Sequence, residues 1–256
     1  MQLISLLLLS VGLYVSPQNP SVDEIVAKAN HAAYYAGTDG RARVTMVITD
    51  ARGGTRERAF TILRRNGEGG DQKFYVYFEA PADVRKTAFL VWKKAQGDDD
   101  RWLWLPDLNL SKRIAPGDKR TSFVGSDFVY EDVSGRGTDE DTHTLVDTTD
   151  THYVLDNVPK DPGSVDFARY RLWVDKTTFL PMKAEYWDTQ GTLFRRVEAL
   201  TVETVQDIPT VMESKVSDLR AGTHTVNRFT DVSYNLGLDD NIFSERFLRR
   251  PPREIR

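Results

Sequence analysis

The chain has 256 residues, of which 40% are hydrophobic and 28% are charged, a composition typical of globular domains with a buried core. Its net charge of −4 gives no general affinity for nucleic acid, so no nucleic-acid partner is expected. The absence of cysteine excludes disulfides, thiolate metal ligands, cysteine nucleophiles and a lipid-carrying cysteine.

The first element along the chain is the apolar run LISLLLLSVGLYV, Leu3 to Val15. About 20 apolar residues are needed to span a bilayer, so this run is too short, whereas its length suits a signal-peptide core. We therefore expect export to the periplasm, with a signal peptide over residues 1–16 that is cleaved between Gly12 and Ser21. No Lys or Arg precedes the run, which is unusual for a signal peptide, and a buried N-terminal helix is the alternative.

The remainder, residues 17–256, is expected to be one domain with a basic C-terminal tail. It begins with a helix, because Ser21 and Glu24 form a capping-box pattern and Ile25 and Ala29 keep helical spacing. Gly37 ends this helix. A short helical turn is predicted in DDNIFSERFL, and the tail RRPPREIR is expected to be solvated.

Between these ends the chain is predicted to form strands. Apolar and aromatic side chains alternate in KFYVYFE, RWLWLP and MKAEYWD, and turn-forming stretches such as NGEGG and DTQGT separate them. The spacing predicts about ten or eleven antiparallel strands.

Several strands carry bulky apolar groups on both faces, as in TAFLVW. This predicts a curved sheet whose inner face lines a cavity or packs on a helix, with a two-layer sandwich as the alternative. Alternation fixes which residues share a face but not which face is inner. The candidates for the cavity lining are Phe74, Phe89, Trp92, Trp102 and Trp104, and we expect an apolar cavity of at least about 300 Å³, the lower end for ligand pockets.

Signals for catalysis and metal binding are weak. The stretch around Ser126 lacks the second glycine of a G-x-S-x-G nucleophile turn. The four histidines show no metal-binding spacing, although His143 and His152 could meet across a hairpin. No cofactor fingerprint is present, so neither a cofactor nor a metal nor an enzymatic activity is expected.

The stretch SFVGSDFVYEDV, residues 122–133, has two interpretations. Asp127 and Glu131 could form a glycosidase carboxylate pair. The interpretation we favour is a helical turn with Ser126 as N-cap and Asp127 in the first turn, and with Phe128 or Tyr130 directed at the sheet. This interpretation predicts that Phe128→Ala lowers the free energy of unfolding by about 3 to 5 kcal/mol and that Glu131→Gln has almost no effect.

Three stretches carry a resemblance to a known family: WLWLPDLNLSKRI, FVGSDFVYEDV and WVDKTTFLPMKAEYWDTQGTLFRRV. Together they resemble the LolA-like family of outer-membrane lipoprotein-sorting proteins, in particular a subgroup with a Gly-Ser-Asp-Phe-x-Tyr-Glu-Asp block, here Gly125 to Asp132.

The resemblance implies a mainly β fold, an unclosed antiparallel barrel with helices that plug its concave face. It implies a monomeric periplasmic carrier for a lipid, lipoprotein acyl chains or another hydrophobic molecule, with an inner-membrane exporter of the resistance-nodulation-division type or an outer-membrane acceptor protein as partner. The candidate ligand-binding residues then also include Phe128 and Tyr130. An envelope lipid sensor on the same fold is the alternative function, and a hydrolase acting through Asp127, Glu131 or the histidines is a third.

Overall fold

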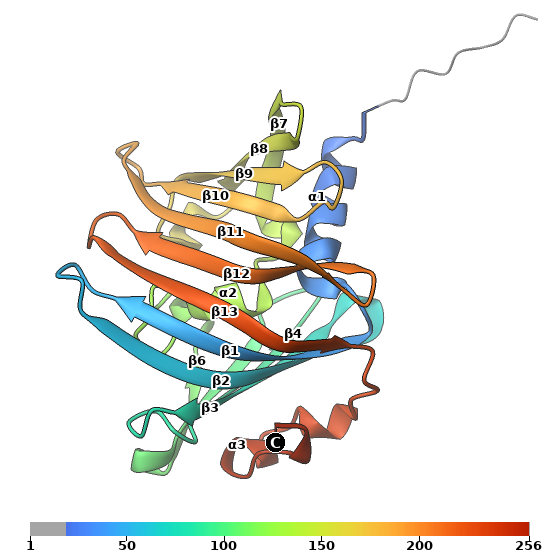
Figure 1. Ribbon diagram of the computed structural model, residues 1–256. Coiled ribbons are helices and arrows are strands. Elements are labelled where there is room, and N and C mark those ends of the chain that lie inside the picture. The colour runs from blue at the N-terminus through green and yellow to red at the C-terminus, as the bar shows by residue number, and fades with distance from the viewer. Residues whose placement is uncertain (1–18, 256) are drawn as a thin grey trace, which may run out of the picture.

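One strongly curved antiparallel sheet dominates the computed structural model, which describes residues 19–255 (Figure 1). The expected signal peptide lies outside the described residues. Within residues 19–255, no helix is both long enough and apolar enough to cross a membrane.

The sheet has thirteen strands. They are β1 (Asp39–Thr49), β2 (Thr55–Asn66), β3 (Gln72–Ala80), β4 (Ala88–Lys93), β5 (Asp100–Leu105), β6 (Leu110–Ile114), β7 (Asp141–Thr148), β8 (His152–Pro159), β9 (Arg169–Asp175), β10 (Pro181–Trp187), β11 (Leu193–Val205), β12 (Ile208–Asp218) and β13 (Thr223–Tyr234).

The helices are short. They are α1 (Val22–Asn30), which continues as the π-helix η1 (His31–Tyr35), then α2 (Tyr130–Ser134) and α3 (Arg246–Arg249). The single-turn 3-10 helices are η2 (Glu68–Gly70), η3 (Pro106–Leu108), η4 (Pro116–Asp118), η5 (Thr138–Glu140), η6 (Pro162–Ser164), η7 (Asp240–Ile242) and η8 (Arg253–Ile255).

Strands that are neighbours in the chain pair with each other, except for β6 and β7. One pair also joins strands that are far apart in the chain. The first strand pairs with the last, so that Val44 of β1 lies between Phe60 of β2 and Phe229 of β13. The strands β6 and β7 are not paired and form the two edges of the order β6-β5-β4-β3-β2-β1-β13-β12-β11-β10-β9-β8-β7. The expected unclosed antiparallel barrel is therefore confirmed. It has more strands than expected, and one of them, β6, carries too few apolar residues to be found by alternation.

The concave face of β1–β6 holds the main core. Its side chains pack against a segment that follows η4, residues 121–134, which we call the plug segment and which includes α2. In Figure 1 both α1 and α2 lie within the curve of the sheet. The helices that the resemblance implies on the concave face are thus present.

The outer face of β2–β5 is covered by the end of the chain. Leu238, Ile242, Phe243, Leu248 and Ile255 are all buried there against apolar side chains of these strands. One helical turn was expected in this region, and the structure has two, η7 and α3. The expectation of a solvated tail is confirmed for Arg249, Arg250 and Arg253, which are exposed, and wrong for Pro252 and Ile255, which are buried. Ile255 packs against the sheet.

Candidate functional site

The helix α1 lies across the concave side of the strands β7–β9. Its Ile25 and Ala29 are buried against Tyr153, Leu155 and Val174. The helix begins at Val22 because the Ser21 hydroxyl accepts a hydrogen bond from the Glu24 backbone N–H, while the Glu24 carboxylate accepts one from the Ser21 backbone N–H. Val22, Ile25, Val26 and Ala29 recur at helical spacing and pack against the sheet, whereas Ala27 is exposed.

Polar contacts hold the end of this helical segment but not its first part. No side chain of residues 22–30 forms a hydrogen bond or an ion pair with the sheet within the part of the chain that the structure describes. At η1, by contrast, Arg64 and Gln72 donate to the backbone carbonyl of Tyr34, over 2.6 Å and 2.7 Å. The segment is therefore anchored at η1, and α1 itself rests on the sheet through apolar contacts, with the Lys28 ammonium 4.8 Å from the centroid of the Phe179 ring.

A cavity of about 190 Å³ lies between α1 and the concave face of β8–β11. Its apolar wall is formed by Val26, Ala29, Ala33, Tyr34, Leu172, Pro181, Ala184, Tyr186 and Val197. The volume is below the range of about 300–1,000 Å³ that ligand pockets usually have. The cavity has an apolar wall as expected, but the expected volume of at least about 300 Å³ is wrong, and this counts against carriage in the form that the structure describes. A long hydrocarbon chain could enter only if α1 moved away from the sheet.

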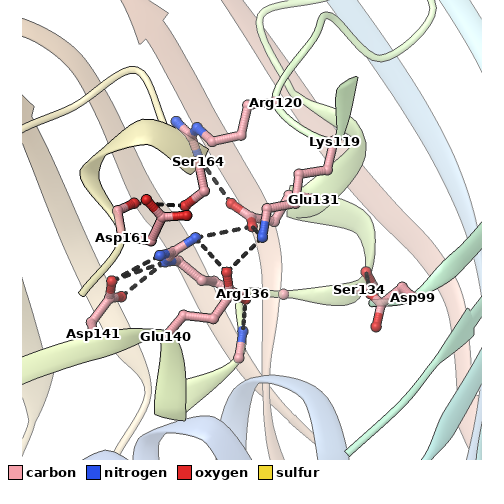
Figure 2. A network of polar contacts seen from close by, with 12 residues as sticks. Asp99, Lys119, Arg120, Glu131, Ser134, Arg136, Glu140, Asp141, Asp161 and Ser164 are labelled. Carbon is pink, nitrogen blue, oxygen red and sulfur yellow. Dashed lines mark hydrogen bonds and ion pairs between the residues drawn. The ribbon is translucent and has the colours of Figure 1, made fainter. Parts of the chain in front are cut away.

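The floor of this cavity is polar and belongs to a buried ionic network (Figure 2). Glu131 of α2 lies at its centre, with its carboxylate 3.1 Å from Lys119, 3.0 Å from Arg120 and 3.3 Å from Arg136. Arg136 also pairs with Asp141 over 2.9 Å. The network thereby joins the plug segment to β7.

The side chain of Glu131 is only 4% exposed. Burial alone would raise the pKa of its carboxyl group, but Arg120, Lys119 and Arg136 together hold this pKa below its ordinary value. Glu131 is therefore a charged structural centre. Among the described residues, Glu131 and Asp127 have no hydrogen-bond or ion-pair partner in common: Glu131 pairs with cations, and Asp127 accepts from threonine hydroxyls.

Gly135 connects the plug segment to the helical segment above the cavity. It follows α2 with φ of 77°, and its N–H closes the helix on the carbonyl of Glu131. A Cβ atom at this position would lie 2.6 Å from the ring of Tyr34 in η1. Only glycine permits this close approach, which packs η1 directly on the end of α2.

Four of the candidate cavity residues lie on the concave side of the sheet, two on its strands and two in the plug segment, and they pack together rather than line a cavity. Phe74 and Phe89 are buried in the main core, and the rings of Phe89 and Tyr130 are 5.1 Å apart. Phe128 is partly buried against the same cluster. The plug segment fills the space that we expected to be a cavity.

The three candidate tryptophans lie on the other face, so the expectation that they line the concave face is wrong. Trp92, Trp102 and Trp104 pack under the C-terminal segment, and the Trp92 indole N–H donates to the carbonyl of Phe243 over 2.8 Å. The physical reason is the two-residue period of a strand. Trp92 lies an odd number of residues from Phe89, so the two cannot share a face.

The expected helix cap is also wrong in its details. The helix α2 begins at Tyr130, and the Asp132 carboxylate, rather than Ser126, accepts the backbone N–H of Val129 over 2.7 Å. The hydroxyl of Ser126 instead donates to the carbonyl of Phe123. Asp127 lies outside the helix and accepts hydrogen bonds from the hydroxyls of Thr223 and Thr225, over 2.5 Å and 2.6 Å, which tie the plug segment to β13.

His143 and His152 do not meet across the β7–β8 hairpin. His143 is opposite Asn157 in the strand register, whereas His152 is opposite Asp175 of β9. The hypothesis of a shared metal site at this pair is therefore wrong.

Sequence reasoning missed the cavity beneath α1. One signal was available, since Ala184 and Tyr186 alternate on β10 and small and aromatic residues on one face leave space beside them. The ionic network had no such signal, because Lys119, Glu131, Arg136 and Asp141 come together only through the path of the loops.

Comparisons with known proteins agree with this architecture. A family model described as "-like: Uncharacterized protein" matches residues 70–250. No curated protein matches the chain. Among solved structures, a DUF1329 family protein from Desulfovibrio piger is 29% identical, with a TM-score of 0.80 over 88% of this chain and 96% of that protein.

Two further structures are similar. A domain named as a candidate outer-membrane lipoprotein-sorting protein, from Vibrio parahaemolyticus, is 27% identical, with a TM-score of 0.79 over 88% of this chain and 97% of that domain. A LolA superfamily protein from Nitrosomonas europaea is 19% identical, with a TM-score of 0.70 over 89% of this chain and 99% of that protein, and it shares the fold.

Proposed function

We propose that this chain, which belongs to the family matched over residues 70–250 and to the LolA-like superfamily of outer-membrane lipoprotein-sorting proteins, is a carrier that holds a hydrocarbon chain beneath α1. The observation that carries the proposal is the apolar cavity between α1 and the concave face of β8–β11. The cargo is a lipid, the acyl chains of a lipoprotein or another hydrophobic molecule. Holding it requires no catalysis, because burial of each methylene contributes about 0.8 kcal/mol.

We infer that the carrier is closed in this structure. The cavity of about 190 Å³ is too small for a long chain, and α1 rests on the sheet through the apolar side chains of Ile25 and Ala29. An acyl chain can replace these contacts with similar ones, so the displacement of α1 costs little net burial. The hydrogen bonds from Arg64 and Gln72 to Tyr34 keep η1 in place and make it the hinge.

The setting we propose is the periplasm, which the apolar segment Leu3–Val15 supports. A carrier there receives its cargo at one membrane or protein and releases it at another. An inner-membrane exporter of the resistance-nodulation-division type as donor, or an outer-membrane protein as acceptor, is the partner that the family resemblance suggests.

A cavity-filling variant tests the binding site. Ala184 is buried at the wall of the cavity, so Ala184→Phe should occupy the space that an acyl chain needs. We expect a fluorescent fatty-acid probe to bind this variant at least about tenfold more weakly than the wild type, the effect of roughly 1.4 kcal/mol. Ala221→Phe in the exposed β12–β13 turn is the control and should bind normally. Equal binding by all three folded proteins would contradict the proposed site.

Cysteine labelling tests the movement of α1, since the natural chain has no cysteine. Ile25 is fully buried against the sheet but does not line the cavity, whereas Asp23 on the same helix is exposed, so single cysteines at these positions form a pair for comparison. Without ligand, a maleimide should label Ile25→Cys much more slowly than Asp23→Cys. A bound acyl ligand should accelerate only the labelling of Ile25→Cys. An unchanged rate in the presence of bound ligand would contradict the displacement of α1.

A further inference from the structure

Lys93 is a buried lysine at the end of β4. It shares the concave face with Phe89 and Val91, and the residue is only 6% exposed. Its ammonium group donates to the backbone carbonyls of Ser134 and Gly135, over 2.7 Å and 3.1 Å. An ammonium has three N–H groups, so one remains after these two hydrogen bonds, and the centroid of the Tyr34 ring lies 5.4 Å from the same nitrogen.

No carboxylate lies within 4.0 Å of this ammonium in residues 19–255. The acids that face it from the neighbouring elements already have cationic partners: Asp99 pairs with Arg101 over 2.6 Å, and Glu131 and Glu140 pair with Lys119 and Arg136. Burial therefore outweighs the attraction of Asp99, Glu131 and Glu140, and Arg101 adds repulsion, so the pKa of Lys93 is lowered. A bound anion would supply the counter-charge that no described residue places within 4.0 Å of this ammonium.

Lys93 lies in the wall of a second cavity, of about 560 Å³, which is within the usual range for ligand pockets. This cavity is polar and adjoins the apolar one beneath α1. The two cavities share the residues Asn30, Gly135, Arg136, Gly137 and Thr138. A molecule with a polar end and a hydrocarbon chain could therefore occupy both.

We propose that the larger cavity binds the anionic headgroup of an amphiphile whose hydrocarbon chain enters the cavity beneath α1, and that the Lys93 ammonium pairs with the anion. This inference rests on the proposed function and specifies its ligand. Asp98 and Asp139 at the exposed rim of the same cavity disfavour a highly charged headgroup. The ligand class is accordingly a singly charged amphiphile, such as a phosphodiester lipid or a fatty acid.

The test compares two lysophospholipids with the same acyl chain, used below their micelle concentrations. Lysophosphatidylglycerol carries one net negative charge, and lysophosphatidylcholine carries none. By isothermal titration calorimetry, we expect the wild type to prefer the anionic lipid at least about tenfold, a difference of roughly 1.4 kcal/mol. Lys93→Met should lose this preference, while Lys93→Arg should retain it. Lys112→Met, which removes an exposed charge on β6 outside both cavities, should also retain it.

Each other outcome is decisive. A folded Lys93→Met variant that still prefers the anionic lipid would overturn the role of Lys93. Equal affinity of the wild type for both lipids would overturn this inference and leave the proposed function intact, whereas binding of neither lipid would overturn both. Glycerophosphoglycerol, the headgroup without its chain, is expected to bind far more weakly than the lipid. Equally tight binding of this headgroup would assign the site to a free anion instead of an amphiphile.

A second measurement does not depend on the stability of the Met variant. The NMR signal of the Lys93 side chain reports its titration in the wild type. Bound lysophosphatidylglycerol should raise the pKa of Lys93, because the anion favours the charged form. An unchanged titration with saturating lipid would overturn the proposed pairing.

Discussion

The ring of Phe123 in the plug segment lies 5.4 Å from the ring of Phe89 on β4. The same ring lies 5.8 Å from Phe78 and 5.6 Å from Tyr130. One side chain thus joins the concave face of the sheet to the segment that fills it. This relationship explains why the space over β1–β5 is a core, while the cavity lies further along the sheet beneath α1.

The first prediction concerns this contact. Phe123→Ala should lower the free energy of unfolding by about 3 to 5 kcal/mol, because it removes a buried ring and leaves a cavity. Urea denaturation measures the change. Leu108→Ala removes a side chain that is 68% exposed and should change stability by less than about 0.5 kcal/mol. Similar values for the two variants would show that the plug segment is not packed as described.

The second prediction concerns Glu131. From the sequence we expected Glu131→Gln to leave the free energy of unfolding nearly unchanged. The structure predicts that this substitution lowers the free energy of unfolding by about 3 to 5 kcal/mol, because the buried cations lose their counter-charge. Glu203→Gln, on an exposed part of β11, is the matched control and should be nearly neutral. A silent Glu131→Gln variant would contradict the network.

The same network predicts a pH dependence. The pKa of Glu131 is lowered in the folded state, so its contribution to stability is present above the ordinary value of 4.5 and disappears as the pH falls through the folded-state pKa. The difference in unfolding free energy between wild type and Glu131→Gln should therefore be largest near neutral pH and shrink in acid. A difference that grows as the pH falls would have the wrong sign.

A third prediction tests the tie between Asp127 and Thr225. Asp127→Ala should lower the free energy of unfolding by about 1 to 3 kcal/mol, because the hydroxyl groups of Thr223 and Thr225 lose their acceptor. The double variant Asp127→Ala/Thr225→Val should cost less than the sum of the single variants, because both remove the same hydrogen bond. Strict additivity in urea denaturation would show that the two residues do not interact.

A fourth prediction concerns export. N-terminal sequencing of the protein from the envelope fraction should begin between Leu13 and Val22, because the apolar segment before this region is expected to be cleaved. Uncleaved protein recovered from the cytosol would end the periplasmic assignment.

Much of the fold was predictable because it depends on local patterns. The capping box at Ser21 and Glu24 fixed the start of α1, and two-residue alternation identified the aromatic strands. Alternation could not show that Phe89 faces inward and Trp92 outward, because the inner face is decided by what covers it. The covering elements are the plug segment and the C-terminal segment, whose positions depend on contacts between distant parts of the chain.

The site was less predictable for the same reason. Glu131 and Asp127 lie four residues apart, yet one pairs with Lys119, Arg120 and Arg136 and the other with two threonines of β13. Lys93 has no sequence signal at all. Its burial follows from the close approach of the backbone at Ser134 and Gly135.

Native mass spectrometry of the mature protein, purified from its own envelope, tests the central claim most directly. The account predicts that wild-type protein carries an additional mass that corresponds to a lipid or another hydrophobic molecule. The Ala184→Phe variant, prepared in the same way, should carry none, because the added ring fills the cavity beneath α1. A wild type that carries no such molecule, or a folded Ala184→Phe variant that retains it in full, would contradict the account.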